Sequence, residues 1–316
     1  MQNLIKERFQ KCTLAAPDRI LVATDLTDTE WLLPHAVAQA KASGSQVTLV
    51  HALRPLDLVP MTPDTITSID QVKILRDTRL TLMGIAQTIK AQGIECTAVV
   101  HRGNPLEVIA EEVDRTGATR VIAGTHGRGK LGQLVLGSVV HQLLDKLDIP
   151  IFAVGPNARN AKHTTPHRVL HPVSFLGDYR DSVRLALDIA QTSRAELTLL
   201  HVLDADLDDT INPERTRKWA EEALSKLIPN AEYLIPPVHI CVTTGDLADE
   251  INRISSQIGA DWIVLGANAS PRSLSLQETL AYKVLTMVNC PVLTLRHHPC
   301  QIERGNLEEI HFTSPL

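Results

Sequence analysis

Aromatic side chains are scarce in this sequence of 316 residues, at 3% of the total, although hydrophobic residues make up 44%. The core must therefore be aliphatic, and segments rich in Val, Ile, Leu and Ala suit buried parallel strands that are covered by helices. Apolar runs that could span a bilayer are also missing, because none reaches the roughly 20 residues required. The N-terminal segment lacks the apolar stretch of a signal peptide, so we expect a cytoplasmic protein with no membrane partner.

Cysteines are few and scattered, and excess positive charge is absent. The five cysteines form no CxxC pair, which argues against a disulfide framework and against cysteine-bound metal, and suits a reducing compartment. They are Cys12, Cys96, Cys241, Cys290 and Cys300. The formal net charge is −5 and the pI is near 6.2, so nothing predicts nucleic acid as a partner.

An internal repeat decides the architecture. Residues 46–52 read QVTLVHA and residues 196–202 read ELTLLHV, so each is a β-rich run that ends near a histidine. Residues 103–124 and 245–266 both begin and end with glycine and share an internal Gly-Ala pair. Matching blocks follow one another in the same order at nearly constant separation. We interpret this as a tandem duplication.

Each copy alternates short apolar strands with helical patterns, such as Leu106, Ile109, Ala110 and Val113 at i, i+3, i+4 and i+7. We therefore expect an α/β protein made of two tandem copies of a doubly wound, mainly parallel five-stranded sheet with helices on both faces. The expected strands are 19–25, 46–52, 95–101, 119–124 and 150–154, then 168–174, 196–202, 237–243, 261–266 and 291–295. The expected units are an extension (1–16), domain 1 (17–156), a linker (157–166), domain 2 (167–298) and a second extension (299–316).

A glycine cluster follows the fourth strand of copy one and precedes a helix, between Gly124 and Ser138. Glycines allow close backbone approach, and a helix N-terminus attracts anions, so this segment is a candidate phosphate site. A P-loop is disfavoured, because Leu131 replaces the required Ser or Thr and the loop follows the fourth strand. A dinucleotide motif is disfavoured, because the next strand ends without an acidic residue. A loop that only turns the chain remains an alternative.

A further pattern in this segment is G-x-x-G, nine residues, then G-S, formed by Gly124, Gly127, Gly137 and Ser138. This pattern resembles the nucleotide-binding signature of the universal stress protein family. Asp25 in VATDLT, His51-Ala52 in TLVHA and Pro150 in IPIFAV lie where that family has supporting residues. The resemblance covers nearly the whole chain, once per copy.

The resemblance implies an adenine nucleotide, ATP or AMP, with or without Mg²⁺. Asp25 and Ala52 would line the adenosine pocket. The phosphates would lie on the loop and on the helix start, against Gly124, Thr125, His126, Gly127, Gly137, Ser138 and Val139. Arg128, and also Lys130, would pair with phosphate oxygens.

Copy two has lost this signature. Ser174 replaces Asp25, Ala269 replaces Gly127, and Glu278 replaces Gly137. A carboxylate now stands where phosphate would lie, and like charges repel. We expect copy two to serve packing or partner contact, although another ligand remains open.

The sequence therefore predicts a nucleotide-binding stress-response regulatory protein with an unidentified protein partner. The resemblance implies an internal pseudo-dimer near strands 150–154 and 291–295, and a further homodimer stays open. One alternative is a slow Mg²⁺-dependent ATPase or phosphotransferase, but no acid–base dyad is evident, so we assign no catalytic residue. The other is a scaffold that binds no nucleotide. We interpret His51 and His201 as hydrogen-bonded structural residues, and we expect no metal site among the histidines.

Overall fold

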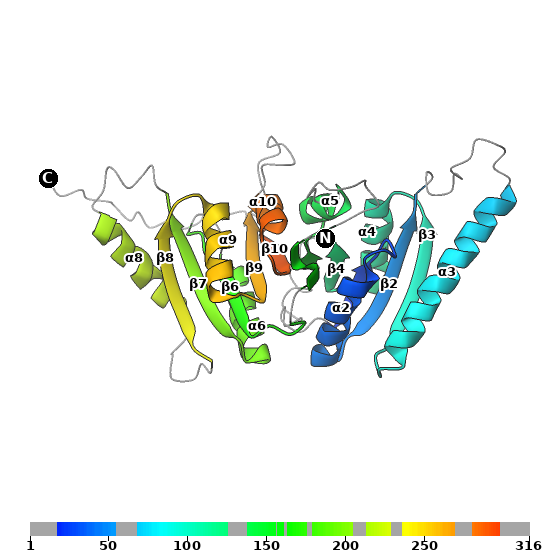
Figure 1. Cartoon of the computed structure of the whole chain (residues 1–316), viewed down its shortest axis with the longest axis horizontal. Coiled ribbons are helices and arrows are strands. Elements are labelled where there is room, and N and C mark those ends of the chain that lie inside the picture. Colours follow the sequence, from blue (N-terminus) through cyan, green and yellow to red (C-terminus); the bar gives the residue numbers. More distant parts are fainter. Residues whose placement is uncertain are drawn as a thin grey trace, which may run out of the picture.

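The computed structural model describes residues 18–54, 68–125, 138–155, 157–160, 163–175, 179–204, 213–228, 236–268 and 280–297. Strands and helices alternate in the same order in both halves (Figure 1). The first half contains β1 (Arg19–Ala23), α2 (Thr29–Ser43), β2 (Gln46–Leu53), α3 (Ser68–Lys90), β3 (Cys96–Arg102), α4 (Pro105–Thr116), β4 (Arg120–Gly124), α5 (Ser138–Lys146) and β5 (Ile151–Val154). After η2 (Asn157–Asn160), the second half contains β6 (Arg168–Pro172), α6 (Arg180–Ser193), β7 (Glu196–Leu203), α8 (Pro213–Ser225), β8 (Val238–Thr244), α9 (Leu247–Ile258), β9 (Trp262–Asn268), α10 (Leu280–Met287) and β10 (Val292–His297).

The strands form one 10-stranded sheet in the order β3-β2-β1-β4-β5-β10-β9-β6-β7-β8. Neighbours within each half run parallel, whereas β5 and β10 run antiparallel where the two halves meet. The predicted fold class is confirmed. The order β3-β2-β1-β4-β5 of the first half is matched in the second half by the equivalent strands in reverse, β10-β9-β6-β7-β8.

Helices cover both faces of the sheet, as predicted. Successive strand residues point to opposite faces, so Ile20 and Val22 of β1 join one core while Leu21 joins the other. The first core includes buried residues from α2, α3, α6 and α8, and the second includes buried residues from α4, α5, α9 and α10. Both cores contain residues of both halves, so apolar packing continues across the junction.

The duplication is also visible in how equivalent helices end. Gly117 after α4 and Gly259 after α9 have φ of 65° and 61°, the left-handed conformation that suits glycine at a helix C-terminus. At the other end, Asn104 and Asp246 cap these helices by accepting hydrogen bonds from backbone N–H groups. The Gly-Ala pairs that the sequence repeats are therefore helix stops.

The halves join through strand five of each copy, as expected. Phe152 of β5 lies opposite Leu293 of β10, and both side chains are fully buried. The Phe152 ring also packs edge-on against Trp262, with the ring centroids 4.8 Å apart. Asn157 adds a hydrogen bond of 3.1 Å to the carbonyl of Thr286. Backbone pairing and aromatic packing together tie the two halves into one sheet.

Phe152→Ala tests this junction. We expect the free energy of unfolding to fall by about 3–5 kcal/mol, because the variant leaves a cavity between β5, β10 and Trp262. Urea denaturation followed by circular dichroism measures the change. Val72→Ala is the control, since Val72 is 62% exposed and should change stability by no more than about 0.5 kcal/mol. A loss below about 1 kcal/mol in Phe152→Ala would contradict a central role for the junction.

Candidate functional site

The predicted site lies at the carboxyl edge of the sheet in the first half. Here β1 lies between β2 and β4, and Ala23 at its end pairs with both Val50 and Ala123. The chain leaves β1 toward β2 on one side, and β4 lies on the other, so this is a point where the strand order reverses. Open α/β sheets bind ligands at such points.

The turn after β1 is held by its own side chains. β1 ends at Ala23, two residues earlier than expected, and Leu26 has a φ of 72°, which few non-glycine residues adopt. The Thr24 hydroxyl accepts a hydrogen bond of 2.9 Å from the Leu26 N–H and donates one of 2.5 Å to Asp28. The chain therefore bends sharply just where Asp25 leaves the strand.

Asp25 is oriented through one of its two carboxylate oxygens. Its Oδ1 accepts hydrogen bonds from the Thr27 N–H at 2.8 Å and from the Thr27 hydroxyl at 2.6 Å. Its Oδ2 is buried and has no partner among the described residues. A buried acceptor without a partner is costly and calls for an explanation such as a ligand or a water molecule. Asp25 thus presents one fixed, unused acceptor at this edge.

Asp28 is a member of the site that the sequence analysis missed. Its side chain is only 2% exposed, and burial raises the pKa of Asp28 to about 6, although the hydrogen bond from Thr24 acts in the opposite direction. The residue stands at the N-cap of α2, but its side chain caps no backbone N–H. An acidic residue before a helical pattern was the available signal, and it suggests a cap rather than a buried carboxyl.

The side chain of Asp28 packs directly against the backbone of Gly124. A Cβ atom at Gly124 would lie 2.5 Å from Oδ2 of Asp28, far inside van der Waals contact. The glycine at the start of the predicted loop is therefore needed for space, because the buried carboxyl occupies the position of its side chain. This packing joins the exits of β1 and β4.

Thr125 and Ala52 border the same edge. The Thr125 N–H and hydroxyl both donate to the carbonyl of Val154, at 3.1 and 3.0 Å, so both donors serve the end of β5. Ala52 is half-buried near the end of β2, in register with His101 of β3. The structure thus brings Asp25, Ala52, Gly124 and Thr125 to one edge.

The remaining predicted residues are only partly described. His126, Gly127, Arg128 and Gly137 lie outside the described residues, as does the side chain of Ser138. α5 begins at Ser138, where the sequence predicts a helix start, and Val139 packs half-buried against the core. The loop's contacts with phosphate therefore stay a prediction.

His51 and His201 are hydrogen-bonded in equivalent places. Nδ1 of His51 donates to the carbonyl of Thr24, and Nδ1 of His201 donates to the carbonyl of Val173, both at 2.8 Å. Since a carbonyl can only accept, Nδ1 carries the proton in each case. Each histidine ties the end of strand two to the end of strand one, which confirms the structural interpretation.

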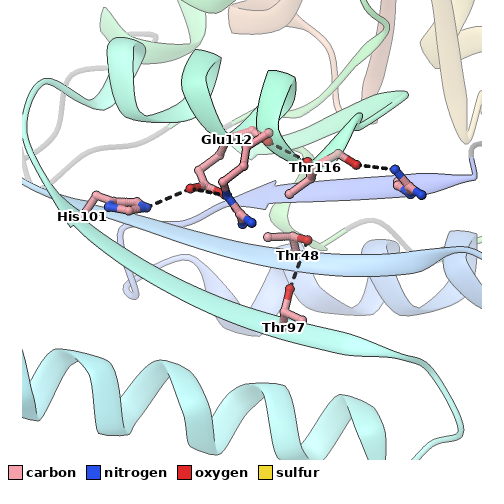
Figure 2. Close-up of polar contacts among 7 residues, drawn as sticks. Thr48, Thr97, His101, Glu112 and Thr116 are labelled. Carbon is pink, nitrogen blue, oxygen red and sulfur yellow. Dashed lines mark hydrogen bonds and ion pairs between the residues drawn. The ribbon is translucent and has the colours of Figure 1, made fainter.

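An ion network lies beside the site, between β3 and α4, where the buried carboxylate of Glu112 meets the exposed side chains of His101 and Arg115 (Figure 2). Nε2 of His101 lies 2.8 Å from Oε1 of Glu112, and Arg115 donates to both Glu112 oxygens at distances of 2.6 to 3.0 Å. Burial alone would raise the pKa of Glu112, but the hydrogen bonds and charges of Arg115 and His101 outweigh it and lower that pKa. Glu112 falls on the apolar side of the predicted helix, which was the signal for a buried partner.

Aromatic rings cluster near the equivalent edge of the second half. The Phe175 ring lies near those of His201, Tyr179 and Trp219, with centroid distances of 4.7, 5.6 and 5.4 Å. Ser174 stands where the first half has Asp25. The segment that would match the phosphate loop, residues 269–279, lies outside the described part of the chain. After the first strand of each half, the first half thus has the Asp25 turn and the second half has the Phe175 aromatic cluster.

Asp28→Asn tests the buried carboxyl. Because the pKa of Asp28 is about 6 when folded and 3.8 ordinarily, the folded protein keeps a proton between these values that the unfolded chain has released. Stability should therefore fall as the pH rises from about 4 to about 6. The variant escapes this loss, so its free energy of unfolding should equal that of the wild type near pH 4 and exceed it by about 2–3 kcal/mol at pH 7.

Urea denaturation at a series of pH values measures this difference. The matched control is Asp246→Asn, because Asp246 is an exposed N-cap residue whose side chain already bonds the helix N–H groups. It should show no comparable gain between pH 4 and pH 7. An Asp28→Asn variant that is equally destabilised at every pH would contradict the prediction.

Proteins of known structure share this architecture. A universal stress protein from Archaeoglobus fulgidus DSM 4304 matches with a TM-score of 0.67 over 89% of this chain and 99% of its own, at 18% identity. A protein of Pseudomonas aeruginosa PAO1 described as functionally unknown matches with a TM-score of 0.62 over 90% of this chain and 94% of its own, at 20% identity. At these identities the likeness concerns the fold. Within the described residues, no helix combines the length and the hydropathy that crossing a bilayer requires.

Sequence relatives point to the same family. Universal stress protein G of Shigella flexneri is 29% identical over 126 residues, which are 36% of this chain and 87% of that protein. Universal stress protein G of Escherichia coli O157:H7 gives the same values. The profile of the universal stress protein family matches twice, over residues 17–155 and 166–296. The chain therefore belongs to the universal stress protein family, with two family domains in tandem.

Proposed function

We propose that the first half binds an adenine nucleotide, ATP or AMP, and that the protein acts as a nucleotide-dependent regulator of the stress response. The observation that carries the proposal is the buried Oδ2 of Asp25, which has no partner among the described residues. Its carboxylate is held by Thr27 at the point where the strand order reverses. Such an acceptor suits the N–H or O–H groups of an adenosine.

The neighbouring residues fit this ligand. Ala52 offers a small, half-buried side chain on the adjacent strand, which leaves room beside Asp25. Gly124 begins the glycine loop, and α5 follows with a helix N-terminus, which favours anions. Phosphates would lie on the loop's backbone N–H groups, and Arg128 would add charge-assisted hydrogen bonds. Mg²⁺, when present, would supply positive charge that neutralises a triphosphate.

The proposed regulation follows from where α5 is attached. Arg296 of β10 donates a hydrogen bond to the carbonyl of Asp145 in α5, so the helix that follows the phosphate loop contacts the second half. A ligand shifts a conformational equilibrium only by binding one state more tightly than another. Nucleotide on the loop would stabilise one position of α5, and this contact would carry the change to the junction.

The second half would then serve packing or partner contact. Its Phe175 cluster occupies the edge that corresponds to the adenosine pocket, and Ser174 offers no carboxylate. Trp219 of this cluster is 55% exposed, so the face presents an aromatic surface to solvent. A protein partner that recognises the nucleotide-bound state would find distinct surfaces on the two halves.

Calorimetric titration of nucleotide-free protein with ATP and Mg²⁺ tests the proposal. We expect one ATP per chain, and we expect Asp25→Asn to weaken binding by about tenfold or more, because it turns the free acceptor into a donor while Oδ1 can still accept from Thr27. The matched control is Ser174→Ala at the equivalent position of the second half, which should leave the affinity unchanged. Equal weakening by both variants would contradict a site in the first half.

A second variant separates binding from the alternatives. Gly127→Ala/Gly137→Glu copies the two glycine losses of the second half and should abolish ATP binding. If the wild type itself binds no ATP, the scaffold interpretation replaces the proposal. Metal-dependent phosphate release that is lost in His126→Ala would instead establish the slow ATPase.

A further inference from the structure

A second candidate site lies at the opposite edge of the sheet, between the two halves. A cavity of about 40 Å³ opens where α2 and α6 end and where β4 and β9 begin. The side chains that line it include Gln39, Ser43 and Arg120 from the first half and Ile189, Ser193 and Trp262 from the second. The cavity is therefore independent of the nucleotide edge.

These six residues form three equivalent pairs. Arg120 and Trp262 are the first residues of β4 and β9, which are the fourth strands of their halves. Ser43 and Ser193 are the last residues of α2 and α6, and Gln39 and Ile189 each lie one helical turn earlier. The cavity thus lies on the pseudo-two-fold axis of the tandem pair. The two walls have diverged, because Arg120 and Gln39 of the first half correspond to Trp262 and Ile189 of the second.

Two hydrogen-bond donors in this cavity wall lack a partner within the described part of the chain. Nη1 of Arg120 donates to Oε1 of Gln39 at 2.8 Å, which fixes the orientation of the Gln39 amide. Nε2 of Gln39 and Nε1 of Trp262 are then donors that are buried without a partner among the described residues. Gln39 is 6% exposed and Trp262 is 4% exposed. A buried donor without an acceptor costs free energy, so the cavity calls for a ligand that accepts hydrogen bonds.

The charge of the cavity is positive. Arg120 is 1% exposed, and although burial lowers its pKa to about 10, it stays protonated at neutral pH. None of the residues that line the cavity is Asp or Glu. The C-termini of α2 and α6 contribute partial negative charge that helps to stabilise the guanidinium, but they leave the Gln39 and Trp262 donors unused. A negatively charged acceptor satisfies both the charge and the donors.

The volume restricts the ligand to a small ion. A cavity needs about 10–15 Å³ for each water molecule, so this one holds about three waters or one small anion. Thr192 on the rim is exposed, which leaves a path from solvent. We propose that this cavity binds one small inorganic anion, of the size of chloride or phosphate, and that the anion fastens the two halves together.

Trp262 itself reports on the cavity. The chain contains three tryptophans, so the double variant Trp31→Phe/Trp219→Phe leaves Trp262 as the single fluorescent tryptophan. This protein is titrated with sodium chloride or sodium phosphate, while sodium gluconate, which is too large for the cavity, keeps the ionic strength constant. We expect a saturable change in Trp262 fluorescence and a rise in Tm with anion concentration. Separate titrations show whether chloride or phosphate is the preferred ion.

Matched variants connect that response to the cavity. Gln39→Met keeps the side-chain length but removes the donor. It should raise the anion concentration at half-saturation by about tenfold. Arg120→Met should abolish the response, and if it fails to fold, Gln39→Met carries the test. Arg79→Met, on the exposed side of α3, controls for general loss of positive charge and should respond like the parent.

The proposal is overturned if fluorescence and Tm are the same in chloride, phosphate and gluconate at equal ionic strength. It is also overturned if Gln39→Met responds like the parent, because the anion would then act elsewhere. Phosphate could also occupy the glycine loop, so the titrations are repeated with Gly127→Ala/Gly137→Glu. The Trp262 response should survive in that variant, and its loss would assign the effect to the loop.

Discussion

The antiparallel pairing of β5 with β10 is the interaction on which the rest of this structure depends. Without it, each half would end in a strand with unpaired N–H and C=O groups, and the buried faces of Phe152 and Leu293 would meet water. The pairing turns two five-stranded units into one sheet and makes both apolar cores continuous. A tandem chain thereby achieves internally what a symmetric dimer achieves with two copies.

This junction constrains some positions and leaves others free to diverge. A residue that packs across the junction contacts the other half, so a change on one side must fit the residues on the other. β5 and β10 therefore both keep buried side chains at their pairing positions. The carboxyl edges lie away from it, and there the first half has Asp25 where the second has Ser174 and the neighbouring Phe175 cluster. On the pseudo-two-fold axis itself, two equivalent arginines would repel one another across a buried space. A tryptophan opposite Arg120 removes that repulsion and packs against Phe152.

The candidate nucleotide site departs from the rules that the rest of the fold follows. Two carboxylates lie within one short turn: one has an oxygen without a partner among the residues that the structure describes, and the other has a raised pKa. Leu26 in the same turn adopts a left-handed conformation. Each of these features costs stability, which is typical of positions that are kept for binding. By contrast, the carboxylate of Glu112 is paired with His101 and Arg115 and serves to fix α4 on β3.

The sequence by itself determined the duplication and the order of strands and helices along the chain, because apolar periodicity acts within one element at a time. It also predicted the structural role of His51, because a buried polar side chain normally has a hydrogen-bond partner. Only the tertiary structure decided that Asp28 fills the space beside Gly124 and that Arg120 meets Gln39. Those contacts join residues some 80 to 100 positions apart, and the register and packing angle that bring them together arise only when the elements pack.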